Sequence, residues 1–412
     1  MRRTSPRPRR RANALVRWAR RTVAVPTAIA ALFVAGTMEP ALAAQGTDPL
    51  AARVAEWARD AGLGFVVTGA ERMAYQVDRP AEGGTLAGGI PTVGAPALDG
   101  PTPAGSPLGL VTPRPTTPSS SAATPRATTA SAKPGATAAS LLELAPIPAR
   151  VSPALAGEGQ WQDAFASRGL VVAKAAFVRP DATHTGYSVA VVAMDAAALT
   201  FNLHQGTQVP GGPTITSPNL TGADLKAALA TFNSGFLMTD ANGGYWQNGT
   251  SVVPLRAGAA SMVFGTDGTL TVQPWPGGTP GKGVAAVRQN LAMLVENGQV
   301  NPLVNTADEP TEEVTWGYTV GVSAYVWRSA VGTRPDGTVV FALGPALNVE
   351  TLASLMADAG CTNAMELDIN STWTSYITYA GGVPHKLTAD QHPPADRYLT
   401  PSTRDFVAVL PR

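Results

Sequence analysis

Residues 364–370, with the sequence AMELDIN, carry the strongest chemical signal in the chain. Because side chains alternate between faces along a strand, the apolar residues of this run are expected to face a core and the polar residues to face the other way. The polar residues are Glu366, Asp368 and Asn370. Two carboxylates on one face are like charges held close together, which pushes their pKa values apart and suits acid/base chemistry or a bound cation. An Asp-x-Asn-Ser-Thr sequence also commonly ends a strand by capping a turn, and this structural alternative stays open.

Local signals predict a hairpin and a helix directly before this strand. Two β-prone runs, 328–333 and 338–343, flank Pro335-Asp336-Gly337, whose residue types favour a tight turn. Asn348 is a good helix N-cap, and apolar residues follow it at helical spacing until Gly360 ends the helix. The sequence therefore predicts strand, turn, strand, helix and strand in that order.

Further turn signals determine the expected fold class. Asn-Gly or Asp-Gly pairs at 248–249, 267–268 and 297–298 each lie between β-prone runs and favour two-residue hairpin turns. Helices are expected at only two or three places in this half of the chain. The predicted class is therefore α+β, with a mostly antiparallel β-sheet domain. No glycine-rich phosphate loop has the strand–loop–helix context that such a loop needs.

Several motifs resemble the phosphodiester glycosidase family, whose members include the enzyme that uncovers mannose 6-phosphate by removing N-acetylglucosamine. The motifs are RSAVGTRPDGTVVFAL with the helix after it and AMELDIN, the turn FNSGF at 232–236, and RQNLAMLVENG at 288–298. They occur in the family's order, and the resemblance covers roughly residues 165–410. One departure is clear: the family usually follows its strand aspartate with glycines and serines, whereas Asp368 is followed by Ile-Asn-Ser-Thr.

The resemblance implies an extracytoplasmic hydrolase that cleaves the bond between a sugar's anomeric carbon and a phosphodiester in a surface glycan or glycoconjugate. The leaving group would be a phosphate monoester, which departs readily because its second pKa is about 6. The site must then supply a carboxylate near the anomeric carbon and positive charge on the phosphate. We assign the first role to Asp368, with Glu366 as its partner.

Arginines are the expected readers of the phosphate, because guanidinium matches phosphate oxygens two at a time and stays charged. Arg256, Arg288 and Arg328 each occur beside strands in a charge-poor domain. Arg328 is the first choice because it begins a family-like motif, and Arg288 is the second; a surface ion pair is the alternative for each. Asn233 and Asn370 would position sugar hydroxyls, although Asn233 also fits a residue that stabilises its own turn.

The N-terminus has the layout of a secretory signal. An arginine-rich run at 2–21 precedes an apolar segment at 22–38 and small residues suited to a signal peptidase. Residues 1–44 are therefore predicted to be a signal peptide, with an uncleaved membrane anchor as the alternative. Either way the bulk of the chain is expected outside the cytoplasm, with membrane contact limited to the N-terminus.

Composition divides the rest of the chain into three parts. Residues 45–78 are predicted to form a short helix–strand segment, with the strand at 63–68, that is too small for a core of its own. Residues 79–160 are rich in Pro, Ala, Thr, Ser and Gly and predict a disordered linker, because they cannot bury enough apolar surface to offset ordering. Residues 161–412 are the predicted glycosidase-like domain. Only 14% of the chain is charged and its net charge is +1, so nothing suggests a nucleic-acid partner.

Metal-binding and redox signals are weak. The one cysteine, Cys361, permits no intrachain disulfide and no structural zinc site, and it is expected to be a buried thiol. The four histidines lack helix-face metal spacing. No cofactor is predicted, with calcium at Asp368, Asn370 and nearby oxygens as the alternative.

A hypothesis from another functional class is a non-catalytic module that binds a cell-wall glycan. In this hypothesis the altered turn after Asp368 marks a degenerate glycosidase site. Tryptophans would serve as sugar-binding platforms, the candidates being Trp246, Trp316 and Trp373.

Overall fold

The computed structural model describes only part of the chain. The described residues are 48–64, 66–67, 70, 79–93, 139–140, 142–305, 315–316 and 325–412. The predicted signal or anchor at 1–44 lies outside them, as does the middle of the predicted linker. Among the helices of these stretches, none has both the length and the apolar character needed to span a membrane.

The largest sheet has nine strands and is antiparallel except for one parallel pair, β1 with β3. Its order is β1-β3-β4-β15-β14-β16-β12-β13, and β2 pairs with β3 as well. The strands are β1 (Ala139–Ser140), β2 (Gln162–Ser167), β3 (Leu170–Val178), β4 (Val189–Met194), β12 (Met293–Glu296), β13 (Gln299–Val300), β14 (Val326–Thr333), β15 (Val339–Leu347) and β16 (Asn363–Glu366).

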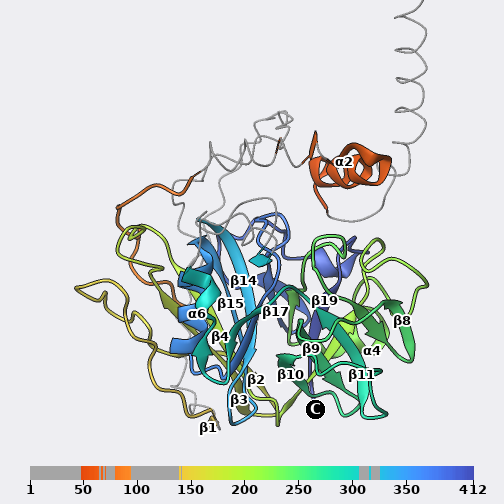
Figure 1. The fold of residues 1–412 in the computed structure, drawn as a ribbon. Helices are drawn as coiled ribbons and strands as arrows, with labels where there is room; N and C mark the ends of the chain where they lie inside the picture. Colours follow the sequence, from red (N-terminus) through yellow and green to blue (C-terminus); the bar gives the residue numbers. More distant parts are fainter. Residues whose placement is uncertain are drawn as a thin grey trace, which may run out of the picture.

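Two five-stranded antiparallel sheets complete the domain (Figure 1). One has the order β10-β9-β11-β7-β8, with β7 (Tyr245–Gln247), β8 (Thr250–Val253), β9 (Ala260–Gly265), β10 (Leu270–Pro274) and β11 (Val284–Gln289). The other has the order β18-β17-β6-β19-β5, with β5 (Leu199–His204), β6 (Ala230–Asn233), β17 (Tyr376–Ala380), β18 (Val383–Lys386) and β19 (Phe406–Pro411). The predicted α+β class with mostly antiparallel sheet is thus confirmed.

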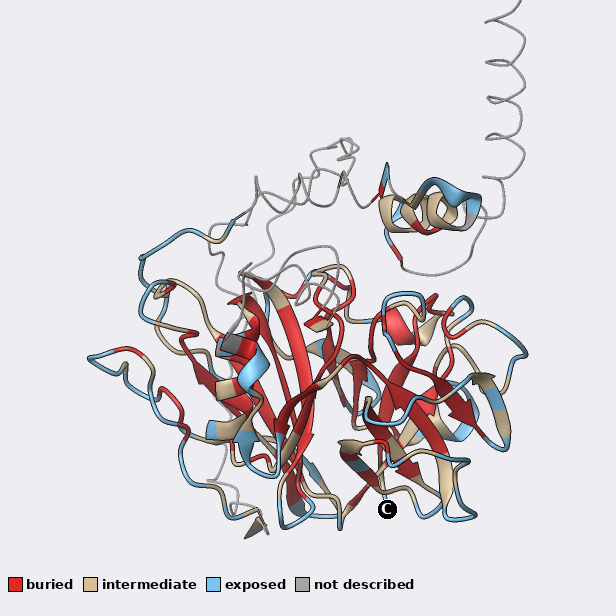
Figure 2. Cartoon of the chain, in the orientation of Figure 1, coloured by how far each residue is buried: buried red, intermediate tan, exposed pale blue. Residues whose placement is uncertain are grey.

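Helices are few and short in the described domain. They are α4 (Gly222–Ala227), α6 (Val349–Asp358), and the 3-10 turns η2 (Pro302–Asn305) and η3 (Arg397–Leu399). The apolar face of α6 packs on the large sheet and forms a second core, with Leu352, Leu355 and Met356 fully enclosed. The main core contains side chains from all three sheets, and the rings of Phe232, Phe341 and Tyr376 contact one another within it. Figure 2 shows these strands as the buried centre of the molecule.

The predicted hairpin and helix before the AMELDIN run are confirmed. β14 and β15 pair as a hairpin across the Pro335-Asp336-Gly337 turn. The Asn348 side chain accepts a hydrogen bond from the Thr351 backbone N–H, and the Thr351 hydroxyl lies within bonding distance of the Asn348 backbone N–H, which together form a capping box. Gly360, at φ 86°, follows the end of α6 in the left-handed conformation that glycine adopts without strain.

The N-terminal segment differs in part from its prediction. Its helix, α2 (Leu50–Ala58), continues into a π-helical turn, Arg59–Leu63. Val66 and Val67 are helical rather than part of the predicted strand. A short apolar run fits a strand or a helix equally well by pattern alone, which explains the difference.

Two parts of the predicted linker pack on the domain. Residues 142–160 bring Ile147 into the core beneath α6, and Glu158 forms a buried ion pair with Arg179 at 2.8 Å. Residues 79–93 contact the domain too, since the Ala81 N–H donates to the Tyr187 hydroxyl. Parts of residues 79–93 and 142–160 therefore contact the domain, through polar groups as well as through Ile147.

Candidate functional site

Asp368 lies where three chain segments meet. It lies two residues after the end of β16, and its backbone N–H donates to the Ser234 carbonyl at 3.2 Å in the FNSGF turn. Its own carbonyl accepts from the Ser329 backbone N–H at 3.1 Å and from the Ser329 hydroxyl at 2.8 Å on β14. Its Oδ1 accepts the Asn370 backbone N–H at 2.9 Å. The backbone bonds fix the position of Asp368, and the Asn370 N–H orients its carboxylate. Oδ2 is the carboxylate oxygen that these bonds do not engage.

The Asp368 carboxylate faces a cation that the sequence analysis did not select. Oδ2 lies 3.7 Å from Nη1 of Arg404, which comes two residues before β19. Burial raises the pKa of Asp368 to about 6, and the positive charges of Arg404 and Arg397 oppose that rise. The carboxylate is only 5% exposed, yet it remains mostly ionised at neutral pH.

Glu366 and Arg328 form an ion pair in the interior. Arg328 Nη1 lies 2.6 Å from Glu366 Oε1, and both side chains are 0% exposed. Arg328 Nε also donates to the Leu347 carbonyl at 2.9 Å. Burial raises the pKa of Glu366 to about 7, while the Arg328 guanidinium acts against the rise and the Asp368 charge adds to it. The predicted neighbouring carboxylates do interact, but Glu366 is held by Arg328 and does not reach solvent.

Arg288 is enclosed in the same way. Its Nε donates to Asp405 Oδ2 at 2.8 Å, with both side chains 0% exposed. Its other donors reach the backbone carbonyls of Gln289 and Phe236. The third arginine considered from the sequence, Arg256, is exposed and contacts Asn242. The guanidinium groups of Arg288 and Arg328 therefore bind acceptors of the protein itself in this structure.

Asn233 and Asn370 lie beside Asp368 and hold the chain around it. Asn233 Nδ2 donates to the Ser329 hydroxyl at 2.9 Å, and its Oδ1 accepts the Ser375 N–H at 2.9 Å. Asn370 Oδ1 accepts the Thr372 N–H at 2.9 Å and so stabilises the turn after the strand. Both asparagines thus bond to the protein scaffold within this site.

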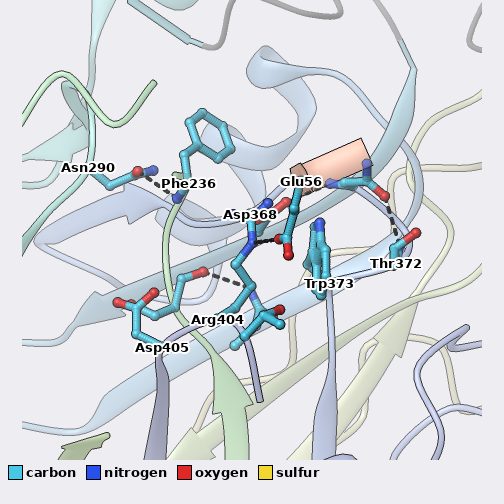
Figure 3. Close-up of polar contacts among 12 residues, drawn as sticks. Glu56, Phe236, Asn290, Asp368, Thr372, Trp373, Arg404 and Asp405 are labelled. Carbon is cyan, nitrogen blue, oxygen red and sulfur yellow. Dashed lines mark hydrogen bonds and ion pairs between the residues drawn. The ribbon is translucent and has the colours of Figure 1, made fainter. Parts of the chain in front are cut away.

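Asn290 connects the FNSGF turn to β16. Its Oδ1 accepts the Phe236 N–H at 3.0 Å (Figure 3). Its Nδ2 donates to the Glu366 carbonyl at 2.8 Å. It belongs to the RQNLAM motif, so two family-like motifs meet through one buried side chain. This contact joins two motifs that lie far apart in the chain.

A second arginine and a tryptophan complete the surroundings of Asp368. The guanidinium of Arg404 lies 4.5 Å from the centre of the Trp373 ring, and that of Arg397 lies 4.7 Å from it. Arg397 also donates to the Thr372 carbonyl at 2.9 Å. We name Arg397, Arg404, Trp373 and Thr403 the arginine–tryptophan site. Its arginines carry the same sequence signal as Arg288 and Arg328, since each lies beside a strand or turn of a charge-poor domain.

Two carboxylates from the N-terminal segment occupy the arginine–tryptophan site. Glu56 of α2 accepts from Arg404 Nε at 2.8 Å. Asp48 lies 3.0 Å from Arg397 Nη2 and accepts from the Thr403 backbone N–H and hydroxyl at 3.1 and 2.6 Å. Figure 3 shows Glu56, Arg404, Asp368 and Trp373 gathered at one place. The sequence gives no signal for these contacts.

The tryptophans and the cysteine considered in the sequence analysis are buried. Trp246, Trp316 and Trp373 are 9%, 1% and 5% exposed, so none offers a free ring face of the kind that a sugar platform needs. Within the described residues no group of three or more metal-ligating side chains comes together. Cys361 is buried, and burial raises the pKa of its thiol to about 12.

Comparisons with known proteins agree with the sequence motifs. No curated protein matches the chain. Among solved structures, the catalytic domain of zebrafish N-acetylglucosamine-1-phosphodiester alpha-N-acetylglucosaminidase is 15% identical, with a TM-score of 0.40, over 61% of this chain and 87% of that chain. A hypothetical protein from Synechocystis is 12% identical, with a TM-score of 0.36, over 60% of this chain and 63% of that chain. Residues 226–393 match the phosphodiester glycosidase family, and this match confirms the resemblance predicted from the motifs.

Proposed function

We propose that the protein is a hydrolase that cleaves the bond between a sugar's anomeric carbon and a phosphodiester. The family match includes Asp368 and the turn that holds it. The observation that carries the proposal is the geometry of this residue: a carboxylate fixed by backbone contacts, with a raised pKa and a guanidinium 3.7 Å from Oδ2. A carboxylate for the sugar and a cation for the phosphate are the two groups that this reaction needs.

Asp368 would act through Oδ2, because Oδ1 is engaged by the Asn370 N–H. In its ionised form Asp368 either removes a proton from the attacking water or attacks the anomeric carbon itself. In the second case water then hydrolyses the bond between Asp368 and the anomeric carbon, which releases the sugar and restores the carboxylate. The bond from the anomeric carbon to the phosphate oxygen breaks, and the phosphate monoester leaves with that bond's electron pair. Because the leaving group is a stable anion, no strong general acid is required.

The remaining predicted site residues act as positioning residues in this proposal. Glu366 and Arg328 form a rigid buried pair beneath Asp368, and Asn233 orients Ser329, whose hydroxyl bonds to the Asp368 carbonyl. Asn370 holds the turn after the strand. The location outside the cytoplasm rests on the signal-like sequence of residues 1–44.

The test is release of free sugar by the full chain from methyl phosphodiesters of glucose, galactose, mannose and N-acetylglucosamine 1-phosphates. We expect Asp368→Asn to lower kcat by about 10²–10⁴-fold with its unfolding curve preserved. Asp163→Asn makes the same chemical change at an exposed position and serves as the control. Equal activity of wild type and Asp368→Asn would refute the role of Asp368.

The anomer first released distinguishes the two roles of Asp368. Proton NMR of the fresh product shows retained configuration for a nucleophile and inverted configuration for a base acting on water. If the folded wild type releases no sugar from any of the four substrates, the hydrolase proposal fails for these sugars, and glycan retention by the protein becomes the next assay.

A further inference from the structure

Helix α2 carries a row of apolar side chains along one side. Leu50, Val54 and Trp57 follow one another at spacings of four and three residues, so at about 100° per residue they lie on one side of the helix. Leu50 is 45% exposed, and Val54 and Trp57 are half-buried. We name these three residues the α2 stripe. Two more exposed apolar side chains, Leu63 and Val66, follow it in the same segment.

The domain does not cover the α2 stripe. The helix is held to the domain from another side, where Glu56, its one buried residue, accepts from Arg404 Nε at 2.8 Å. At helical spacing Glu56 lies about 120° around the helix from the centre of the stripe. In the part of the chain that the structure describes, no stripe residue belongs to a hydrophobic core or packs against one. Figure 2 shows α2 at the edge of the molecule, mostly half-buried or exposed.

The α2 stripe is too small for a stable protein interface. An exposed apolar patch marks contact with another molecule or with a membrane. One aromatic side chain buries about 150–250 Å², so the three stripe residues together bury roughly a few hundred Å². A stable protein–protein interface buries about 800 Å² on each partner. A membrane surface sets no such minimum, because a short apolar stripe adds to whatever else holds the protein there.

The sequence before α2 indicates that the available surface is lipid. The apolar run at 22–38, predicted to be a signal or an anchor, ends nine residues before Asp48, and nine extended residues span at most about 30 Å. Export therefore brings α2 to the outer surface of the membrane, whether the run is then cleaved or retained. Trp57 fits this place, because tryptophan rings favour the headgroup level of a bilayer. The helix can lie in the plane of that surface with the stripe towards the lipid.

We infer that α2 is a membrane-surface helix, and that the α2 stripe lies among the lipid headgroups on the outer face of the membrane. Glu56 and Asp48 bond to the domain from the other parts of the segment, so they hold the domain near that surface. The inference shares with the proposed function only the location outside the cytoplasm. It holds whatever reaction Asp368 performs.

The test is fluorescence quenching of the full chain in vesicles of equal parts phosphatidylcholine and phosphatidylglycerol. Ala61→Cys places a thiol for a polarity-sensitive fluorophore at an exposed position one turn beyond Trp57. The native Cys361 does not compete for the label, because it is buried and burial raises the pKa of its thiol to about 12. We expect a lipid with a nitroxide near the top of its acyl chain to quench this fluorophore about threefold or more. The same fluorophore at Asp163→Cys, an exposed position of the domain, should not be quenched.

A pair of matched variants separates the α2 stripe from the apolar run at 22–38. Leu50→Gln/Val54→Gln makes the stripe polar with residues that favour helix, and it should lower the lipid-bound population of α2 about tenfold or more. Quenching of the α2 fluorophore should then fall to that of the domain fluorophore. The control Leu170→Gln/Val383→Gln changes two exposed apolar residues of the domain and should leave the quenching unaltered. Circular dichroism and urea unfolding verify that each protein is folded.

Three outcomes would overturn the inference. The first is quenching at Ala61→Cys that is no stronger than at Asp163→Cys. The second is undiminished quenching in the folded Leu50→Gln/Val54→Gln variant, because the apolar run at 22–38 alone would then account for it. The third is a blue shift of the α2 fluorophore that appears without vesicles and grows with protein concentration, which would show a second copy of the chain on the stripe. Release of sugar in the assay of the proposed function bears on none of these results.

Discussion

Replacing Arg328 with methionine tests whether this arginine is an interior ion-pair partner or a reader of phosphate. Its Nη1 lies 2.6 Å from Glu366 Oε1, and both side chains are 0% exposed. The substitution leaves the Glu366 carboxylate buried without its cation. Removing one partner of a buried pair typically costs about 3–5 kcal/mol, and we expect that loss in the free energy of unfolding at pH 8.

A double variant supplies the matched control. Arg328→Met/Glu366→Leu replaces both charges with apolar groups, and such replacements of buried pairs are often close to neutral. The Leu347 carbonyl still loses the hydrogen bond from Arg328 Nε, which accounts for about 1 kcal/mol. The double variant should therefore be more stable than Arg328→Met alone.

The loss in the free energy of unfolding caused by Arg328→Met should depend on pH. Without the guanidinium that lowers it, the pKa of Glu366 rises further in the folded state. The folded variant then holds a proton that the unfolded chain has lost, so its stability falls as pH rises above the ordinary carboxylate range towards the raised value. The loss measured at pH 8 should exceed the loss at pH 5.

Urea unfolding followed by tryptophan fluorescence at both pH values measures these differences. A loss below about 1 kcal/mol in Arg328→Met, or no recovery in the double variant, would refute the ion-pair account. A folded double variant that no longer binds methyl phosphate would show instead that Arg328 contacts phosphate, as the sequence first suggested.

Three further predictions concern the site and the elements that carry it. Because Asp368 must be ionised and its pKa is raised to about 6, kcat/KM should fall as pH drops below about 6; a profile flat down to about pH 4.5 would remove Asp368 from this role. Gly235→Ala would place a Cβ 2.8 Å from Asn290 Oδ1, so the free energy of unfolding should fall by about 1–3 kcal/mol in urea titration, and unchanged stability would contradict the packing described between these motifs. Asn348→Ala removes the N-cap of α6 and should cost about 1 kcal/mol in the same titration, whereas Asn348→Ser should retain most of that stability; equal losses would argue against the cap.

Elements that depend on the preferences of neighbouring residues were predicted correctly from the sequence. The β14–β15 hairpin depends on the Pro335–Gly337 turn, and α6 begins and ends through Asn348 and Gly360. Each of these features depends on backbone preferences acting over a few residues. The run before Asp368 departs slightly from its prediction, since β16 ends at Glu366 and Asp368 lies just beyond it.

The neighbourhood of Asp368 was also predictable in part. The FNSGF turn and the AMELDIN run do meet, because Asn233 and the Asp368 carbonyl share the Ser329 hydroxyl. The identity of the cation beside Asp368 was not predictable from the residues near it. Arginines beside strands look alike in the sequence, and whether a guanidinium points into the interior or towards a ligand depends on which acceptors surround it.

The sequence by itself predicted the hairpin and helix before Asp368, the antiparallel class and the family resemblance, and it singled out Asp368 as the candidate carboxylate. Only the tertiary structure decided that Arg288 and Arg328 are neutralised in the interior, and that Arg397 and Arg404 flank the site. The contact between Glu56 and Arg404 joins residues 348 positions apart. Such a contact arises when a distant segment packs against the domain, and no local preference along the chain records it.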